Sequence, residues 1–224
     1  MNYTYCEALM WHALAPAAFR YLSGQEPGMD VAALKRRSKQ IYREMTARTP
    51  DIGSLTENPL RICLTGGMLW LSIYEAADGQ MSEERFAGMV DASMQAPLVK
   101  ASFRGKAKTA FTLKSQQNRA AVAARTDAGS SPFHWDTEVI LGRDAEEYTI
   151  IYRQCGLCAL GRQEKLPQLV PYMCVLDIMS VDWMGGRLYR TKTLASGGDC
   201  CDFYICKKDS RWDEERRMAE EGKL

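Results

Sequence analysis

The first half of the chain repeats apolar residues at helical spacing. Residues 5–22 are apolar and rich in alanine, which predicts a first helix. Asp30 is a suitable N-cap for a second helix, and Thr49-Pro50 should end it, because proline disfavours helical conformation in the residue before it. One face of that second helix carries Val31, Leu34, Ser38, Ile41 and Met45.

Three further helices are predicted before residue 125. Asn58-Pro59 should start the third, since the missing N–H of proline costs nothing at the first helical position. Residues 62–73 are apolar nearly all round, which predicts a central helix. Ser82 is expected to cap the fourth helix and Pro97 to open a fifth. The basic stretch 100–119 is expected on a solvated helix face, with Lys100, Arg104, Lys106, Lys108 and Lys114.

The pattern changes to alternation after a polar break at 126–132. Residues 135–141 and 148–153 look like two strands joined by Gly142-Arg143-Asp144. Residues 187–195 and 201–206 alternate in the same way around a turn at 196–199. A short helix is predicted within 156–170, and the charge-dense end from Lys207 onward is predicted to be a solvated or fraying helix.

These elements predict an α+β fold, in which a helical N-terminal half packs against an antiparallel sheet from the C-terminal half. The helical part is 1–125, the cysteine-rich α+β part is 132–207 and a charged tail is 208–224. We expect one compact domain overall, because 224 residues can bury a full core without a disulfide or a metal.

The nearly equal numbers of basic and acidic residues limit the kinds of partner that we expect for this protein. The chain has 29 Lys+Arg and 28 Asp+Glu, a net charge of +1, so we expect no nucleic-acid partner and no membrane partner. Its longest apolar-rich stretch, 62–74, is too short to span a bilayer, and residues 1–7 lack the features of a secretory signal. A cytoplasmic location is therefore expected, and self-association into a homo-oligomer stays open.

Cysteine is concentrated in the last third of the chain. Six of the eight cysteines lie between residues 155 and 206, and the reducing cytosol favours free thiols, ligands or catalytic groups. Cys155 and Cys158 form a CxxC pair that could bind zinc or an iron–sulfur cluster together with Cys174 and Cys201, if the fold brings them together. The alternative is that several of these cysteines are simply small buried residues. Apart from zinc or an iron–sulfur cluster, we expect no cofactor.

Two further residue groups suggest chemistry. Cys174 and Asp177 are three positions apart and would share one face of a helix, but not of a strand. Asp177 is either a buried, hydrogen-bonded anchor or a site group. Arg190 lies in the densest polar stretch and could hold a carboxylate through two parallel hydrogen bonds. His134 is the imidazole nearest to the cysteine-rich half and is the default general base near neutral pH.

No serine-hydrolase elbow, phosphate-binding P-loop, dinucleotide GxGxxG or HExxH zinc motif is present. Over residues 150–205, however, the sequence resembles the L-2-amino-thiazoline-4-carboxylic acid hydrolase family. The resemblance rests on Cys155-Gly156-Leu157-Cys158, on Cys174 followed by Asp177, and on Arg190-Thr191-Lys192-Thr193-Leu194-Ala195-Ser196-Gly197-Gly198 with Cys201-Asp202-Phe203.

The resemblance implies a hydrolase that opens a small cyclic isothiourea, amidine or amide ring, with N-carbamoyl-cysteine as the product in the family's own reaction. The implied substrate has a carboxylate, for which Arg190 is the expected partner, and Asp177 or Asp202 would pair with its amidinium. Thr191 and Thr193 are counted with the substrate-binding residues.

The nucleophile stays open at this point. Either Cys174 or Cys201 attacks as a thiolate, or a water attacks with a carboxylate or His134 as its base. Two other readings remain: a non-catalytic binder or sensor of a small ligand, and a zinc or iron–sulfur protein held by the C-terminal cysteines.

Overall fold

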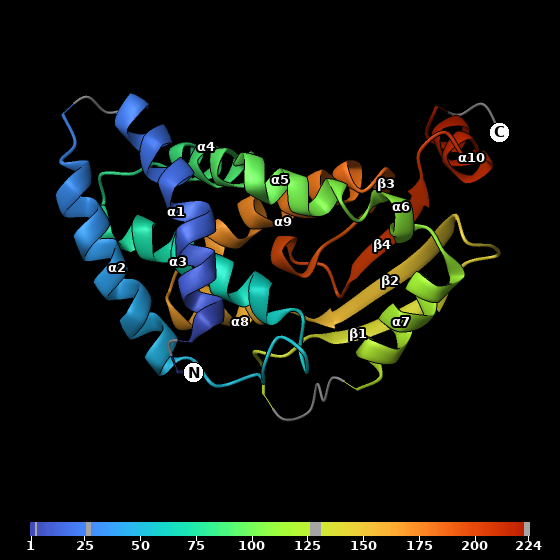
Figure 1. The fold of residues 1–224 in the computed structure, drawn as a ribbon, viewed down its shortest axis with the longest axis horizontal. Helices are drawn as coiled ribbons and strands as arrows, with labels where there is room; N and C mark the ends of the chain where they lie inside the picture. The colour runs from blue at the N-terminus through green and yellow to red at the C-terminus, as the bar shows by residue number, and fades with distance from the viewer. Residues whose placement is uncertain (3, 26–27, 126–130, 222–224) are drawn as a thin grey trace.

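The computed structural model describes residues 1–2, 4–25, 28–125 and 131–221, and its fold is α+β, as predicted (Figure 1). The first half folds into α1 (Tyr5–Gln25), α2 (Val31–Arg48), α3 (Arg61–Ala76), α4 (Glu83–Met94), α5 (Pro97–Arg104), α6 (Ala107–Ala110) and α7 (Leu113–Ala123). The second half contains β1 (Asp136–Leu141), β2 (Glu147–Gln154), α8 (Gly156–Gln163), η1 (Pro167–Leu169), α9 (Val170–Trp183), β3 (Gly186–Tyr189), η2 (Leu194–Ser196), β4 (Cys201–Lys207) and α10 (Arg211–Glu220). The predicted break at 126–132 falls mainly on residues 126–130, which lie outside the described residues.

Of the four helix starts predicted at Asp30, Asn58-Pro59, Ser82 and Pro97, three are confirmed. The Asp30 carboxylate accepts a hydrogen bond from the N–H of Ala33 at 2.9 Å, and the Ser82 hydroxyl accepts one from Arg85 at 3.2 Å. The start predicted at Asn58-Pro59 was two residues early, because α3 begins at Arg61. Asn58 closes a turn there instead, by donating to the carbonyl of Ile52 and accepting from the N–H of Leu60.

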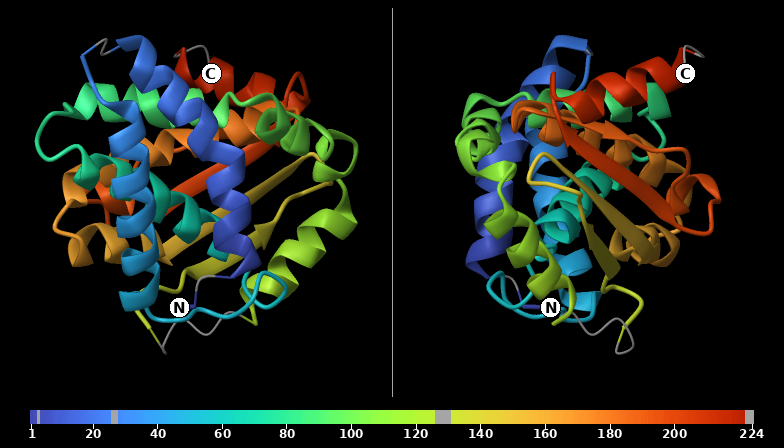
Figure 2. Two further views of the ribbon diagram at one scale, coloured as in Figure 1. Left: turned by 60° about the vertical axis from the view of Figure 1, so that its left-hand side comes forward. Right: turned by 90° about the vertical axis from the view of Figure 1, so that its right-hand side faces the viewer.

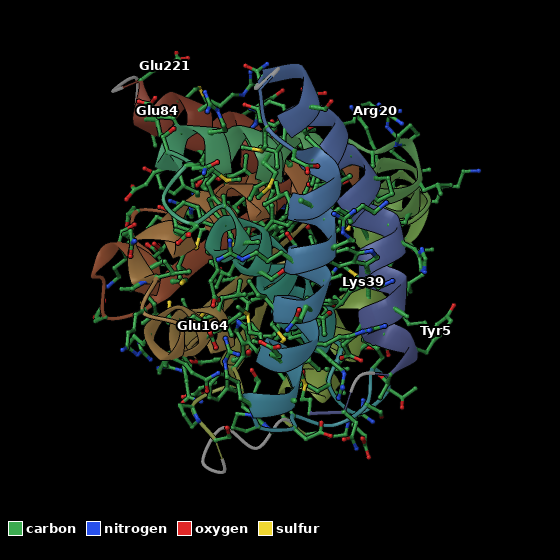
Figure 3. The ribbon with its side chains drawn as sticks, turned by 90° about the vertical axis from the view of Figure 1, so that its left-hand side faces the viewer. Tyr5, Arg20, Lys39, Glu84, Glu164 and Glu221 are labelled. Atoms are coloured by element: carbon green, nitrogen blue, oxygen red, sulfur yellow. The ribbon has the colours of Figure 1, made fainter. Side chains whose placement is uncertain are left out.

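The central position predicted for α3 is confirmed. Leu64, Met68 and Ile73 have no exposed surface, and α1 and α2 pack against this helix. Lys39 of α2 reaches toward α1 (Figure 3), where its Nζ lies 5.8 Å from the centroid of the Trp11 ring. Burial of this almost wholly apolar helix stabilises the helical half.

A buried ion pair joins α1 to α3. The Arg61 guanidinium donates to Oε1 of Glu7 from Nε at 3.1 Å and from Nη2 at 2.9 Å, and neither side chain is exposed by more than 5%. Its Nη1 donates to Asp51 and to the carbonyl of Gly53. Because its hydrogen bonds stay within the protein, the pair is a structural anchor.

The fifth helix predicted from Pro97 is broken into three. α5 starts at Pro97 as predicted, but Phe111 leaves the helical conformation and the Thr112 hydroxyl caps α7. Gln116 of α7 is buried and donates to the carbonyls of Asp144 and Glu147 at 2.8 Å each, so α7 is fixed to the β1–β2 turn.

The sheet is antiparallel throughout, in the order β1-β2-β4-β3. Ile150 pairs with Phe203 and Tyr152 with Cys201, which aligns the buried positions of the two central strands. We call this buried side the inner face; Phe111, between α6 and α7, contacts it against Tyr148, and α9 contacts it through Val181. Figure 2 shows α7 on the same side of the sheet as the N-terminal helices.

β3 is shorter than the predicted strand at 187–195, because it ends at Tyr189. The N–H groups of Thr191 and Lys192 donate to the Asp202 carboxylate at 3.0 and 2.9 Å, and Thr193 caps η2. Side-chain oxygens therefore replace the strand ladder in this segment. The predicted strand over 187–195 was therefore wrong for the residues beyond Tyr189, Arg190 included.

The C-terminal segment is helical, but its first turn is not solvated as predicted. Trp212 is 6% exposed and Asp213 is fully buried. The Asp213 carboxylate accepts hydrogen bonds at 2.7 Å from Nε of Arg187 and from the hydroxyl of Tyr189, which anchors α10 to β3. Within the described ranges, none of the helices has the length and apolar character needed to cross a membrane.

Candidate active site

Two hydrophobic clusters meet between the helical half and the sheet. The larger comprises the core of α1–α4 with parts of α8 and α9, and the smaller lies on the inner face of the sheet. Tyr152 of β2 and Leu194 of η2 pack against both clusters. Ionisable side chains from α3, β2, α8, α9 and β4 shift one another's pKa values across this junction. We take this junction as the candidate site.

Cys174 and Asp177 share one face of α9, as predicted for helical spacing. Arg190 extends from the end of β3 to this face. Its Nη1 donates to the carbonyl of Cys174 at 2.9 Å and lies 3.4 Å from Oδ2 of Asp177. Its guanidinium carbon lies 5.5 Å from the centroid of the Phe203 ring. Arg190 is therefore oriented by three neighbours and holds the Asp177 carboxylate in turn.

Asp177 is accessible and poorly hydrated at the same time. Its side chain is 44% exposed, yet desolvation by the surrounding protein raises its pKa to about 6, and the Arg190 charge opposes this increase. Cys63 of α3 is also exposed, and its pKa is raised to about 12 by desolvation and by the charges of Asp177 and Cys155. Both side chains thus reach solvent while neighbouring protein atoms desolvate them, and we call this part of the junction the recess.

The CxxC pair occupies the start of α8, directly after β2. Cys155 is the N-cap residue, and its thiol is hydrogen-bonded to that of Cys158. This mutual hydrogen bond raises the pKa of Cys155 and lowers that of Cys158. The thiolate of Cys158 is thus easier to form than that of an isolated cysteine. The backbone N–H groups of Leu157 and Cys158 act on Cys155 and only partly offset the rise in its pKa.

Cys174 and Cys201 are disfavoured as thiolates. Desolvation, followed by the charge of Asp177, raises the pKa of Cys174 to about 12. Desolvation raises the pKa of Cys201 to about 11, although its sulfur accepts a hydrogen bond from the N–H of Leu194 at 3.3 Å. A cysteine nucleophile needs a lowered thiol pKa, so neither Cys174 nor Cys201 is activated in this conformation.

The four predicted metal ligands lie near one another without forming a metal centre. The charges of Cys174 and Cys201 act on Cys158, so these residues share a neighbourhood with the CxxC pair. Among the residues that the structure describes, however, no group of three or more His, Cys, Asp or Glu side chains is arranged to hold a metal ion. All eight cysteines are free.

Asp202, Thr191 and Thr193 lie apart from the thiols. Asp202 follows Cys201 on β4, and adjacent residues of a strand point to opposite faces, so its carboxylate is on the outer face. There it accepts hydrogen bonds from the Thr191 hydroxyl at 2.5 Å and from two backbone N–H groups. The Thr193 hydroxyl bonds to Ser196. These residues shape the loop 190–200.

A groove of about 410 Å³ on the outer face contains Thr191 and Asp202, between the sheet and α10. Cysteine is not among its lining residues. The Asp202 carboxylate already accepts hydrogen bonds from the loop that carries Thr191. The reactive groups therefore favour the inner recess as the site.

His134 precedes β1, and its carbonyl accepts a hydrogen bond from the Gln154 side chain at 3.1 Å. Its backbone thus lies near the start of α8. Its Nδ1 is buried and has no hydrogen-bond partner within the described ranges. No hydrogen bond joins its ring to a site carboxylate or thiol of the described residues.

Three residues of the recess were not predicted from the sequence. Tyr152 and Cys63 lie on elements whose apolar pattern indicated only core, and Arg119 was assigned to a solvated helix face. Yet the pKa of Tyr152 is raised by desolvation and then by Asp177 and Cys63, and Arg119 opposes this. The alternation of β2 could have placed Tyr152 inward, but no local signal brings α3, α7 and α9 to it.

The fold is α+β, and the recess brings a carboxylate, an arginine and several thiols close together. Comparison with models of known protein families identifies the family of the chain. The model of the family described as L-2-amino-thiazoline-4-carboxylic acid hydrolase matches residues 64–205, more than half of the chain, and the chain belongs to that family. Membership of this family supports a hydrolase-like function for the chain. No curated protein and no solved structure matches the chain significantly.

Proposed function

We propose that this protein hydrolyses a small cyclic amidine or isothiourea, in the manner that the family name describes for L-2-amino-thiazoline-4-carboxylate. The observation that carries the proposal is Asp177, an accessible carboxylate with a pKa of about 6 held by Arg190 in a recess. A general acid–base catalyst works best when its pKa is close to the operating pH.

The reaction consumes one water. The water oxygen bonds to the ring carbon between nitrogen and sulfur, the ring carbon–sulfur bond breaks, and the sulfur leaves with a proton as a thiol. The product is the open-chain carbamoyl compound. In the ionised form Asp177 accepts the proton of the attacking water, and in the protonated form it returns a proton to the departing sulfur.

Arg190 acts in this proposal as a positioning residue. Its Nη1 is engaged by Asp177 and by the carbonyl of Cys174, so it favours the ionised carboxylate and fixes its direction. We assign Asp202, Thr191 and Thr193 to the support of the loop that carries Arg190, because their oxygens bond within that loop and its strand.

A covalent route is the second candidate mechanism, and the hydrogen-bonded Cys155–Cys158 pair favours it over Cys174 or Cys201. A thiolate of the pair would attack the ring carbon, the ring sulfur would leave, and water would then cleave the enzyme-bound isothiourea. Mass spectrometry of quenched reactions would detect that adduct, whereas the water route forms none.

The decisive experiment measures thiol release from L-2-amino-thiazoline-4-carboxylate by the purified protein, by Asp177→Asn and by Asp182→Asn. Asp182 is the matched control, since it lies on α9 and pairs with Lys208 on the surface. We expect Asp177→Asn to lower kcat by about 10²–10⁴-fold and Asp182→Asn to leave it nearly unchanged. Equal rates for all three proteins would rule out Asp177 as the catalyst.

Two other classes of protein, described below, would give different results in the same assay. A binder or sensor would be stabilised by the ligand without releasing thiol. A zinc or iron–sulfur protein would purify with stoichiometric metal and would lose activity on treatment with a chelator. Metal analysis of the same preparation separates that class from the other two.

A further inference from the structure

The two cysteines of the CxxC pair lie on a single turn, at the point where β2 leads into α8. Cys155 is the N-cap residue, with an extended backbone (φ −134°, ψ 118°), and Cys158 is the third residue of the helix. The N–H of Ala159 donates to the carbonyl of Cys155 at 3.1 Å, so the turn between them is regular. Side chains at the N-cap and the third helical position are neighbours, as in a capping box. The two thiols are accordingly hydrogen-bonded to each other.

Close packing on both sides holds this turn in place. A Cβ atom added to Gly156 would lie 2.2 Å from the carbonyl oxygen of Phe133, so the segment before β1 rests directly on this glycine. On the other side, a Cβ atom added to Gly67 of α3 would lie 2.4 Å from Cδ2 of Leu157. Both residues between the cysteines are thus fixed by neighbouring segments. The thiols therefore stay side by side without a bond between them.

One thiol of the pair is easily ionised, and the other is within reach of solvent. Cys155 is partly exposed, whereas Cys158 is only 8% exposed. The Cys155 thiol donates its hydrogen bond to Cys158, which lowers the pKa of Cys158. Because the proton can cross this hydrogen bond, the negative charge formed at Cys158 is also available at Cys155. A small electrophile in solution therefore meets a thiolate at the accessible sulfur of the pair.

We infer that Cys155 and Cys158 form a reversible dithiol–disulfide site, which a small-molecule disulfide oxidises and a small thiol reduces. In the first step the Cys155 thiolate attacks one sulfur of the small disulfide, whose S–S bond breaks, and one thiolate leaves. In the second step the Cys158 sulfur attacks Cys155 in the mixed disulfide, and the second small thiolate leaves. The two protons of the pair pass to the departing thiolates, so the pair loses two electrons and the small disulfide gains them. This chemistry is independent of the ring substrate.

Two properties of the pair oppose each other and make its disulfide reversible. The fixed turn favours the oxidised form, because the two sulfurs meet without further loss of backbone freedom. The stabilised thiolate favours the reduced form, since a thiol of lowered pKa leaves faster when a reductant attacks the disulfide. The Cys155–Cys158 disulfide is therefore expected to open again in excess thiol, unlike a structural disulfide.

The test exposes the unaltered protein to oxidised glutathione and follows one peptide. Trypsin cuts after Arg153 and Arg162, so the peptide 154–162 contains both cysteines of the pair and no other cysteine. Remaining thiols are blocked with iodoacetamide before digestion. We expect this peptide to lose two hydrogen atoms and to carry neither the label nor glutathione. Treatment with excess reduced glutathione before blocking should restore two labels.

Variants assign the two roles within the pair. In Cys158→Ser, Cys155 should keep one glutathione, because no second thiol displaces it. Cys174→Ser is the matched control, since it removes another thiol of the recess and should leave formation of the disulfide unchanged. Three results with the unaltered protein would overturn the inference: two labels after exposure to oxidised glutathione, a peptide that retains glutathione, or a disulfide that resists excess reduced glutathione.

Discussion

Nη1 of Arg190 lies 3.4 Å from Oδ2 of Asp177, and the two residues come from different elements, the end of β3 and the middle of α9. The contact joins a positive charge to a carboxylate that its surroundings desolvate. Without the arginine, burial alone would raise the pKa of Asp177 further. The pair therefore sets the pH range in which the carboxylate is ionised.

Replacing Asp177 should stabilise the protein at neutral pH. The folded-state pKa of about 6 exceeds the usual 3.8, so the folded chain binds the proton more tightly and the free energy of unfolding falls as pH rises through this interval. Asp177→Asn removes that loss, which we place at about 1 kcal/mol because the exposed side chain is screened by solvent. Thermal unfolding at pH 7 should show a higher Tm than the unaltered protein, and no gain at pH 3.5. A lower Tm at pH 7 would contradict the raised pKa.

Replacing Arg190 should displace the pH dependence of hydrolysis. The Arg190 charge lowers the pKa of Asp177, so Arg190→Gln should move the acidic limb of kcat/KM from near pH 6 to higher pH. Arg190→Lys should shift it less, since the charge remains. An acidic limb at the same pH in all three proteins, with only the rate reduced, would show that Arg190 does not act through Asp177.

The order of thiol alkylation should follow pKa rather than exposure. In a Cys200→Ser background at pH 7.5, iodoacetamide should label the Cys155–Cys158 pair first, because one thiol of the pair has a lowered pKa. Cys63 is the internal comparison: it is exposed, but its pKa is raised to about 12. Peptide mass spectrometry over time gives the order, and earlier labelling of Cys63 would be the contrary result.

Breaking the buried ion pair between α1 and α3 should destabilise the fold. Burial alone would raise the pKa of Glu7, but hydrogen bonds from Thr4 and Arg61 outweigh it and lower the pKa below the usual 4.5. We expect Glu7→Gln to lower the free energy of unfolding by about 3 kcal/mol at pH 7, because it leaves the Arg61 charge without its buried partner.

Urea unfolding would measure this loss, with Glu44→Gln on the surface of α2 as the control. Since a lowered carboxyl pKa stabilises the fold above the unfolded-state value, the difference between the proteins should persist at neutral pH. It should shrink as pH falls below about 4.5 and through the lower folded-state pKa. A difference that is independent of pH would point to packing rather than charge.

Local sequence signals accounted for much of the fold. The caps at Asp30 and Ser82 and the apolar face of α3 depend on contacts within a few residues, and they were predicted correctly. The strands β1, β2 and β4 followed from alternation. The sharing of one α9 face by Cys174 and Asp177 follows from helical spacing, but the sequence left open whether this segment is a helix or a strand.

The site itself depended on tertiary structure. Asp202 and Cys201 are neighbours in sequence but lie on opposite faces, and Arg190 leaves the strand register because Asp202 takes the backbone N–H groups beyond it. Arg119 looked like one of many surface cations until the break at Phe111 turned α7 onto the sheet.

The sequence by itself therefore determined most of the elements and the family, since these reflect short-range periodicity and a local motif. Only the tertiary structure decided which of the thiols, carboxylates and arginines share a recess and how their pKa values shift. Those properties arise from desolvation and from charges on segments that are distant in the chain, and no local pattern encodes them.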